Sequence, residues 1–227
     1  MKTRKKILII ATNHDRLNNG QETGYWLGEI THFYNILADA GFEIDFASPK
    51  GSKPPMDKKS YNLRDRDNRK FIENSNLKQR LETPIPIDQL NPEDYMAIYY
   101  AGGHGAMWDF PNNKTLAQVA AAIYENGGFV AAVCHGSAGL LNIQLADGRY
   151  LLDGKSATGF ANLEERLIRL TSAVPFLLED EIKKRGAQYK RALLPFIPHV
   201  VVNDRLVTGQ NPQSAKAVAK ALIQLIE

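Results

Sequence analysis

The single cysteine of the chain, Cys134, is followed directly by a histidine, and these two residue types together can perform nucleophilic chemistry. A thiolate attacks an electron-poor carbon, while an imidazole holds or passes the proton. Five apolar residues precede Cys134, and small residues occupy 136–139. This pattern predicts a strand buried on both faces, then a tight turn into a helix, as in a nucleophile elbow. We expect the helix N-terminus to favour the thiolate at neutral pH.

Cys134 also has a purely structural interpretation, because most free cysteines are small buried hydrophobic residues. The neighbouring residue types decide between the two. An imidazole at His135 needs a third group to orient it, and either Glu164 or Glu165 could supply that group. Backbone N–H groups of Gly103 and His135 could form an oxyanion hole. Spacing alone therefore makes nucleophilic catalysis a plausible hypothesis and leaves the orienting acid open.

The elements that would position these residues alternate between apolar strands and amphipathic helices. This alternation predicts one α/β domain over 1–227, with a mostly parallel sheet and helices on both faces. Ligands bind such folds at the carboxyl ends of strands, where the glycine-rich loop 101–105 and Cys134 both fall. We expect strands at 6–12, 42–48, 94–100, 129–133 and 154–160, a hairpin at 200–208, and helices at 24–40, 115–126, from 162, at 175–185 and at 212–227.

The first predicted helix contains an acidic residue beside its apolar face. On the helix at 24–40, Trp26, Ile30, Phe33, Tyr34 and Leu37 recur at helical spacing, and Glu29 lies beside this apolar stripe. A carboxylate in that position usually turns toward solvent.

Asn162 is a plausible cap for the helix that follows it. Residues 50 to about 86 differ from the rest, with many charged and few apolar side chains. We expect a solvated excursion with one short helix near 69–80, and assign it no chemistry.

Composition excludes several classes of function. The net charge of +3, from 28 basic and 25 acidic residues, indicates neither a nucleic-acid nor a membrane partner. No apolar run approaches the roughly 20 residues of a membrane span. One cysteine allows no intramolecular disulfide or thiolate metal cluster, which fits a cytoplasmic location. Five scattered histidines lack metal-ligand spacing, and the glycine-rich loop lacks a nucleotide-binding motif, so we expect no metal and no cofactor.

Several motifs resemble the ThiJ/PfpI superfamily and occur in order along the chain. They are Tyr-Ala-Gly-Gly-His-Gly, Ala-Val-Cys-His-Gly, Thr-Gly-Phe-Ala-Asn-Leu-Glu-Glu, Val-Pro-Phe-Leu-Leu-Glu-Asp and Thr-Gly-Gln-Asn-Pro-Gln-Ser. The chain is most similar to the branch of small stress-response proteins described as glutathione-independent glyoxalase III and as holding chaperones. The resemblance implies a flavodoxin-like three-layer sandwich related to class I glutamine amidotransferases, and a homodimer.

The resemblance also implies roles for individual residues. Cys134 matches the reactive cysteine of the family, and His135 matches its partner histidine. Glu29 matches the acid of the first helix that approaches the thiol. Glu165 best matches the acid that orients the histidine, although an offset of one would give that role to Glu164.

The resemblance also bears on the other four histidines and on Trp108. His104 matches a histidine that lines the pocket. Trp108 is placed in the same pocket, with packing in the core or a lid as the alternative. His14, His32 and His199 match no functional position, and we interpret them as structural or surface residues.

The implied activity is that of a cofactor-free lyase, a glyoxalase III also called D-lactate dehydratase. Methylglyoxal or glyoxal would form a hemithioacetal with Cys134, and His135 or Glu29 would move a proton between C1 and C2. Hydrolysis of the resulting thioester would release lactate or glycolate. For proton transfer, the pKa of Glu29 should be raised by burial.

Three alternatives accompany this hypothesis. A cysteine peptidase or amidase would use the same thiolate and imidazole, but in an open groove. A non-catalytic chaperone or redox sensor would carry Cys134 oxidised to a sulfinic acid, and an exposed apolar patch would favour it. Deglycation of proteins is also attributed to relatives, and turnover of free methylglyoxal can mimic it. A closed, small pocket that contains Glu29 favours the aldehyde substrate.

Overall fold

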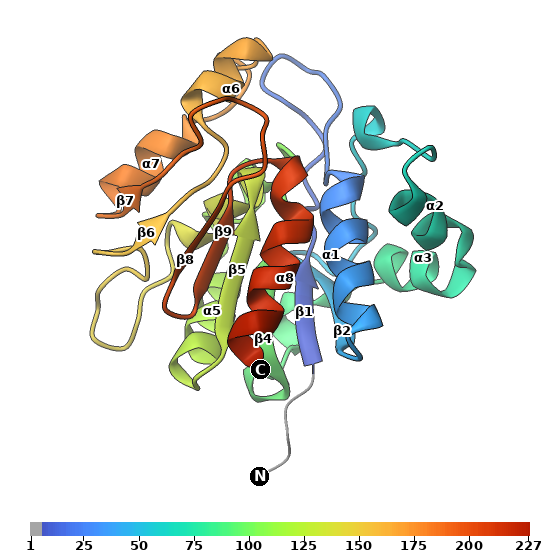
Figure 1. The fold of residues 1–227 in the computed structure, drawn as a ribbon, viewed down its shortest axis with the longest axis horizontal. Helices are drawn as coiled ribbons and strands as arrows, with labels where there is room; N and C mark the ends of the chain where they lie inside the picture. The colour runs from blue at the N-terminus through green and yellow to red at the C-terminus, as the bar shows by residue number, and fades with distance from the viewer. Residues whose placement is uncertain (1–5) are drawn as a thin grey trace.

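The computed structural model describes residues 6–227 and is built around a seven-stranded sheet (Figure 1). Its strands are β1 (Lys6–Ile10), β2 (Glu43–Ser48), β3 (Ile85–Pro86), β4 (Tyr95–Tyr100), β5 (Phe129–Val133), β8 (Val200–Asn203) and β9 (Leu206–Gly209). A second, two-stranded sheet pairs β6 (Ser156–Ala157) with β7 (Gln188–Tyr189). The order in the large sheet is β3-β2-β1-β4-β5-β9-β8, and only the β8–β9 hairpin is antiparallel. The predicted mostly parallel sheet is confirmed.

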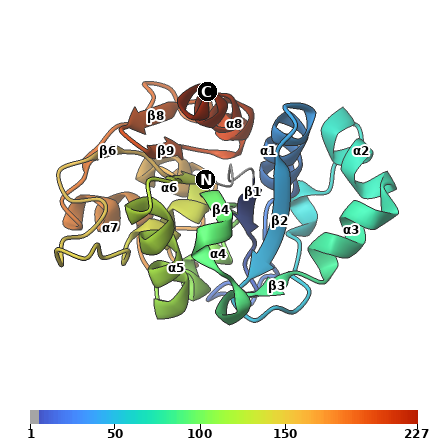
Figure 2. The same ribbon diagram turned by 90° about the horizontal axis from the view of Figure 1, so that it is seen from below.

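Helices cover both faces of this sheet. Figure 2 shows α1 (Leu27–Asp39) and α8 (Ala215–Ile226) on one face and α5 (Lys114–Glu125) on the other, which gives the expected three layers. Because both faces are covered, the inner strands are buried on both sides and read as continuous apolar runs. The remaining helices are α2 (Arg66–Glu73), α3 (Ser75–Glu82), α4 (Ala106–Asp109), α6 (Asn162–Leu167) and α7 (Leu178–Lys184), with 3-10 helices at 58–60, 87–89, 92–94, 134–140 (η4) and 212–214.

Helix α1 begins at Leu27, three residues later than the sequence predicts. The backbone before it is used elsewhere: the Tyr25 N–H donates to Pro55 O and the Trp26 N–H donates to Gly102 O. These bonds hold the segment extended, and Trp26 becomes the N-cap residue. The helix still buries Ile30 and the other apolar residues of its stripe, as expected.

The charged excursion contains two helices, α2 and α3, where one was expected. Asn74 interrupts the helical run, because its backbone is extended and its side chain accepts the Leu77 N–H that starts α3. The excursion is also not simply solvated. Its α2 residue Asn68 is buried and accepts a hydrogen bond of 2.5 Å from Thr31 of α1.

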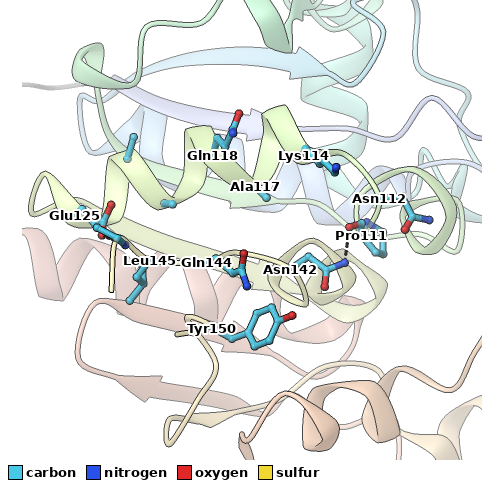
Figure 3. Close-up of a pocket in the computed structure, with 13 residues that line it drawn as sticks. Pro111, Asn112, Lys114, Ala117, Gln118, Glu125, Asn142, Gln144, Leu145 and Tyr150 are labelled. Atoms are coloured by element: carbon cyan, nitrogen blue, oxygen red, sulfur yellow. Dashed lines mark hydrogen bonds between the residues drawn. The ribbon is translucent and has the colours of Figure 1, made fainter. Parts of the chain in front are cut away.

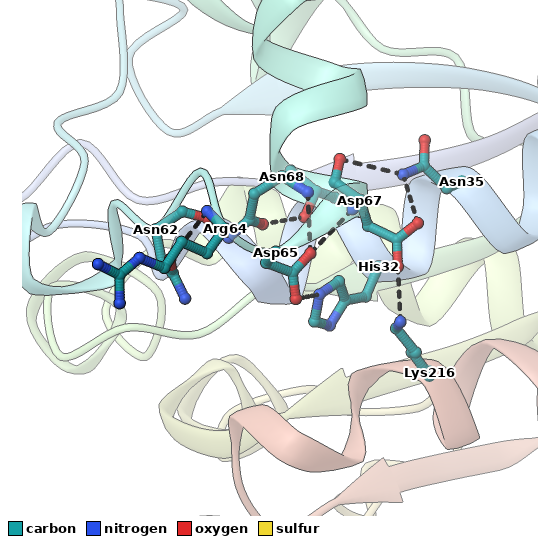
Figure 4. A network of polar contacts seen from close by, with 9 residues as sticks. His32, Asn35, Asn62, Arg64, Asp65, Asp67, Asn68 and Lys216 are labelled. Carbon is teal, nitrogen blue, oxygen red and sulfur yellow. Dashed lines mark hydrogen bonds and ion pairs between the residues drawn. The ribbon is translucent and has the colours of Figure 1, made fainter.

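A network of polar contacts attaches α2 to both helices of the adjoining layer (Figure 4). His32 of α1 lies 2.9 Å from the Asp65 carboxylate, which also caps α2. Lys216 of α8 pairs with Asp67 at 2.6 Å. The segment that looked like a loose charged excursion is therefore bound to α1 and α8.

Three further expectations near the carboxyl end of the chain need correction. The strand expected at 154–160 is reduced to the two residues of β6, and α7 begins at Leu178. Asn162 is the first residue of α6 and does not cap it, because its side chain donates to Asp180 of α7.

The predicted hairpin at 200–208 is confirmed, with Asp204 in its turn at a φ of 55°. Over the described residues, no helix combines the length and apolar character needed to cross a bilayer.

Candidate active site

The order β2-β1-β4-β5-β9 is that of flavodoxin-like folds, and the chain changes its direction of strand addition between β1 and β4. Crevices form at such a switch point, beyond the carboxyl ends of the strands. The loop 101–105 leaves the end of β4 there, and Cys134 follows the end of the neighbouring strand β5. The two motifs that the sequence marked as reactive are thus brought to one edge.

Cys134 lies between β5 and η4 with a φ of 55°, in the left-handed region that non-glycine residues seldom adopt. Such a conformation costs roughly 1–3 kcal/mol and is found where the surroundings enforce it, often at active sites. Only 3% of the residue is exposed. A strained cysteine between a buried strand and a helix is the geometry that a nucleophile elbow requires.

Glu29 is fully buried beside this thiol, although the sequence suggested that such a carboxylate turns toward solvent. One oxygen, Oε2, accepts the Gly102 N–H at 2.6 Å, and the other, Oε1, has no partner among the described residues. Gly102 must be glycine, since a Cβ there would lie 2.6 Å from Oε2. Burial raises the pKa of Glu29 to about 8, against the opposing effects of Gly102 and Cys134, as expected. Glu29 is therefore a neutral carboxylic acid near pH 7.

The thiol itself differs from the sequence expectation. Burial raises the pKa of Cys134, and an ionised Glu29 would raise it further, while the His135 N–H has the opposite, smaller effect. The helix end therefore does not by itself release the proton at neutral pH. Because Glu29 keeps its own proton at that pH, its repulsion is absent, and removal of the thiol proton falls to a neighbouring base.

His135 is the base in contact with the thiol. Its Nδ1 lies 3.3 Å from Cys134 Sγ, and its Nε2 lies 2.7 Å from Glu165 Oε2. His104 contacts the other oxygen of the same carboxylate at 3.1 Å, and the two imidazole rings are 3.9 Å apart. The Phe160 ring also packs against His135, with the ring centres 4.3 Å apart. Three residues thus fix the orientation of one imidazole.

The protonation states of His135 and Glu165 follow from burial and from their contacts with each other. Burial and the neighbouring His104 lower the pKa of His135 to about 4, although Glu165 acts in the opposite direction. Although burial opposes ionisation of Glu165, hydrogen bonds and charge interactions with His135 and His104 hold its pKa well below its usual range. At neutral pH the arrangement is a neutral imidazole, able to accept a proton at Nδ1, held by a carboxylate at Nε2.

The two consecutive acids have different partners. Glu165 faces His135, whereas Glu164 turns away and accepts hydrogen bonds from the Ala161 N–H, the Phe196 N–H and the Asn211 side chain. Both side chains are buried. The ambiguity of one position that the sequence left open is thus decided by geometry.

Gly103, to which the sequence assigned an oxyanion role, has a backbone conformation that only glycine fits. Its φ is 100°, and a Cβ would lie 2.2 Å from Gly24 O, so only glycine fits. Its N–H has no acceptor among the described residues. Trp108, in contrast, is half-buried on α4 and stacks on His14 with ring centres 4.6 Å apart. The ring also packs against the hydrophobic core, which is one of the two alternatives expected from the sequence.

Sequence reasoning left two parts of the site unassigned. The Gly102 N–H holds Glu29, and the Phe160 ring covers His135. Both residues belong to motifs that the sequence analysis quoted, but neither carries a group that signals chemistry by its type. His32 belongs to the network of Figure 4, and His199 lies near Glu164 with a buried Nε2 that has no partner among the described residues.

Several surface depressions of the described residues are not lined by Cys134. One of about 670 Å³ lies between α5 and the segment 142–150, where Gln118, Asn142 and Tyr150 line it (Figure 3). Two others, of about 540 and 520 Å³, also do not include Cys134. The cysteine is instead enclosed by its neighbours, so the site favours a small ligand.

Among residues 6–227, two clusters have potential metal-ligand atoms within 4.8 Å of one another: His104, His135 and Glu165, and His32 with Asp65 and Asp67. The histidine spacing in the sequence did not predict either cluster, since the fold joins residues far apart in the chain. In both clusters the carboxylates are already engaged by imidazoles or by Lys216.

Comparison with known proteins adds four findings, one match to a family model and three to individual proteins. The model of the DJ-1/PfpI family matches residues 22–225. A glutathione-independent glyoxalase of Saccharomyces cerevisiae is 34% identical over 98% of each chain. Among solved structures, glyoxalase III of Candida albicans has a TM-score of 0.90 at 30% identity, covering 98% of this chain and 97% of that one. The Rapid Encystment Protein 24 KDa of Francisella tularensis has a TM-score of 0.94 at 39% identity, covering 98% and 99%.

Proposed function

The chain belongs to the DJ-1/PfpI family, and from that premise we propose that it is a glutathione-independent glyoxalase acting on methylglyoxal and glyoxal. One observation carries the proposal: the buried Cys134 thiol lies 3.3 Å from His135 Nδ1 and beside the fully buried Glu29 carboxyl. The directions of the pKa shifts support it, since burial raises the pKa of Glu29 and lowers that of His135. Conversion of a 2-oxoaldehyde to a 2-hydroxy acid requires a nucleophile and groups that move protons between adjacent carbons. Cys134, His135 and Glu29 supply these.

In the first step the Cys134 sulfur attacks the aldehyde carbon, C1, while His135 Nδ1 takes the thiol proton. As the carbon–sulfur bond forms, the carbonyl oxygen of C1 becomes negatively charged. It then takes up a proton, which yields a hemithioacetal. The N–H groups of Gly103 and His135 stabilise the oxyanion. Glu165 stabilises the imidazolium that forms, without taking its proton.

In the second step a base removes the proton from C1, and a proton is delivered to C2 through an enediol. The C–H electron pair of C1 becomes that of C2, so C1 is oxidised to a thioester carbonyl and C2 is reduced to an alcohol. No external oxidant is needed. His135 and Glu29 are the candidate carriers, since a carboxyl with a pKa of about 8 exchanges protons readily near neutral pH.

In the third step water attacks the thioester carbonyl, and the carbon–sulfur bond breaks. Lactate forms from methylglyoxal and glycolate from glyoxal, and the thiol regains its proton. His135 is placed to take the proton from the attacking water, in the role it plays toward the thiol in the first step.

The enclosed position of Cys134 supports a small aldehyde over a peptide. A peptidase needs an extended groove across its nucleophile, whereas 3% of Cys134 is exposed and Glu29 occupies the space beside it. Glu29 also has no role in acyl transfer by a cysteine–histidine pair. Holding-chaperone activity would depend on a surface elsewhere and is compatible with this chemistry.

The first experiment is lactate formation from methylglyoxal, without glutathione, by wild-type protein and Cys134→Ala. We expect turnover by the wild type, loss of at least about 1,000-fold in the variant, and D-lactate in a stereospecific assay if the D-lactate dehydratase name applies. Circular dichroism of both proteins controls for folding. Absence of turnover by folded, reduced wild type would refute the glyoxalase proposal.

A further inference from the structure

An exposed apolar patch lies outside the site described so far. It consists of Leu193, Leu194 and Ile197 in the loop 190–199, and of Leu167 and Ile168 at the end of α6; we call it the loop patch. Leu193 is 91% exposed and Leu194 60%. Single exposed aliphatic residues are ordinary, but a cluster of five in two adjoining segments indicates a surface that contacts something.

The loop is held firmly at its base. The Phe196 N–H donates to Glu164 Oε1 at 2.7 Å, and the Asn211 side chain donates to Ile197 O at 2.8 Å. Leu167 and Ile168 follow Glu164 within one helical turn, so they belong to the same short segment that this contact joins to the loop. Figure 1 shows the chain between β7 and β8 passing α6 at the end of the sheet to which the parallel strands point. The loop patch is thus a fixed projection.

The charged residues next to the loop patch along the chain are basic, while the nearby acids Glu179 and Asp180 of α7 accept hydrogen bonds from Asn162. Arg166 and Arg169 flank its α6 residues, and Lys190 and Arg191 precede its loop residues; all four are exposed. None of them forms an ion pair with another described residue. The acids of α6, Glu164 and Glu165, are buried and occupied by hydrogen bonds. The loop patch therefore presents aliphatic side chains beside four exposed basic residues that form no ion pair with the described residues.

We propose that the loop patch docks the protein on the surface of a lipid bilayer that contains anionic lipids. Projecting aliphatic side chains enter the acyl boundary, while basic residues beside them contact the anionic head groups. A fluid bilayer accommodates a convex projection such as Leu193, whereas a folded partner would need a matching pocket. A second copy related by a two-fold axis would set the basic residues against each other.

Net charge did not reveal this surface. A value of +3 for the whole chain argued against a membrane partner, because acidic residues elsewhere balance the local cluster. Docking of this kind needs no membrane-spanning helix. It is also independent of the proposed glyoxalase activity, since no residue of the loop patch contacts the thiol, His135 or Glu29 through the hydrogen bonds described above.

The test is co-sedimentation of the full-length protein with sucrose-loaded vesicles of phosphatidylcholine, with or without 30–50% phosphatidylglycerol. We expect at least about tenfold tighter binding to the anionic vesicles, decreasing with salt. The double variant Leu193→Asp and Leu194→Asp should lose at least about tenfold. Arg166→Gln with Arg169→Gln should lose about fivefold for each charge. The matched control is Leu225→Asp with Lys220→Gln on the exposed end of α8, which should bind as wild type.

Thermal melts and methylglyoxal turnover verify that each variant is folded. Equal binding of wild type and the Leu193/Leu194 variant would overturn the proposal, as would equal binding to neutral and anionic vesicles. Light scattering measures the oligomeric state and so tests whether a second copy of the chain occupies the loop patch. If the Leu193/Leu194 variant is monomeric, the wild type is dimeric and neither binds vesicles, the loop patch is a subunit interface and the proposal is wrong.

Discussion

Glu29 is a carboxyl group that its surroundings keep neutral. The side chain is fully buried, one oxygen has a single backbone donor, and the other has no partner among the described residues. A carboxylate in such a place would be poorly solvated, so the proton is retained to a higher pH. The neutral acid can donate to a sulfur or oxygen that becomes negative, which a solvated glutamate at pH 7 cannot do.

The burial of Glu29 predicts a specific dependence of stability on pH. Its pKa is about 8 in the folded protein against 4.5 as the reference, so the folded state holds the extra proton between these values. Stability from this group is therefore lost as pH rises from about 4.5 to 8, by at most ~1.4 kcal/mol per pH unit. Glu29→Gln, which stays neutral, should lose less stability over the same range in urea unfolding.

The comparison of the two proteins cancels the contribution of all other titrating groups. The side-chain amide introduced by Glu29→Gln would still offer an oxygen to the Gly102 N–H, so the fold should be retained. Parallel stability curves from pH 5 to 8 would show that Glu29 is ionised in the folded state. In turnover, Glu29→Gln should lose about 100-fold or more in kcat/KM, because the amide cannot exchange a proton.

His135 sets the acid limit of activity. Burial lowers its pKa to about 4, so the free imidazole persists well below 6.5. We expect kcat/KM for methylglyoxal to stay nearly constant between pH 5 and 7 and to fall only toward pH 4, because this parameter follows the free enzyme. The measurement is a pH–rate profile corrected for the folded fraction. A tenfold loss per pH unit beginning near 6.5 would contradict the assignment.

At the scale of elements, helix α6 serves two purposes through adjacent side chains. Glu165 holds His135 and His104, while Glu164 joins α6 to the loop 190–199 and to Asn211. Adjacent residues on a helix point about 100° apart, so one turn can face both the site and the loop. One short helix thus contacts both the His135 imidazole and the loop 190–199, through two different side chains.

This division predicts different consequences for the same substitution at neighbouring positions. Glu164→Gln turns an amide donor toward buried donors and should cost about 2 kcal/mol or more in the free energy of unfolding, with little change in kcat/KM once folded. Glu165→Gln should lower kcat/KM by about 100-fold or more, because the charge that stabilises the imidazolium is lost. Urea unfolding and methylglyoxal turnover of both variants test this. Equal effects of the two substitutions on both measurements would refute it.

At the scale of the whole molecule, the segment 50–86 belongs to the body of the protein. Buried Asn68 accepts from Thr31 and donates to Asn62 O, while His32 and Lys216 contact Asp65 and Asp67 from two other helices. The exposed pairs contribute little. Asn68 is the member of this network whose bonds are protected from water.

Asn68→Ala should therefore destabilise the protein by about 1–3 kcal/mol, since Thr31 and the Asn62 carbonyl lose their partner. Hydrogen exchange should increase mainly over 62–82. The matched control is Lys70→Ala on the same helix: its pair with Asp39 spans 3.2 Å, but both side chains are more than half exposed. That variant should change stability by less than ~0.5 kcal/mol. A larger effect at Lys70 than at Asn68 would show that surface charge holds the segment.

Local pattern in the sequence was enough for the parallel sheet, the helices on both faces and the position of Cys134 at a strand end. These depend on periodicity over a few residues and on turn residues, which neighbours along the chain determine. The motifs around Cys134 and His104 were likewise sufficient for the family. The same local reasoning wrongly predicted one helix at 69–80, because it did not recognise that Asn74 starts a second helix.

Only the tertiary structure decided which partner each buried polar group has. Glu165 meets His135 across 30 positions, Gly102 meets Glu29 across 73, and Phe196 meets Glu164 across 32. Such contacts depend on how distant elements pack, and no periodicity encodes them. Burial then set the charges: it keeps Glu29 neutral, lowers the pKa of His135 and raises that of Cys134. The sequence nominated Cys134, His135 and Glu29 as candidate reactive residues, and packing determines their protonation because desolvation depends on the whole fold.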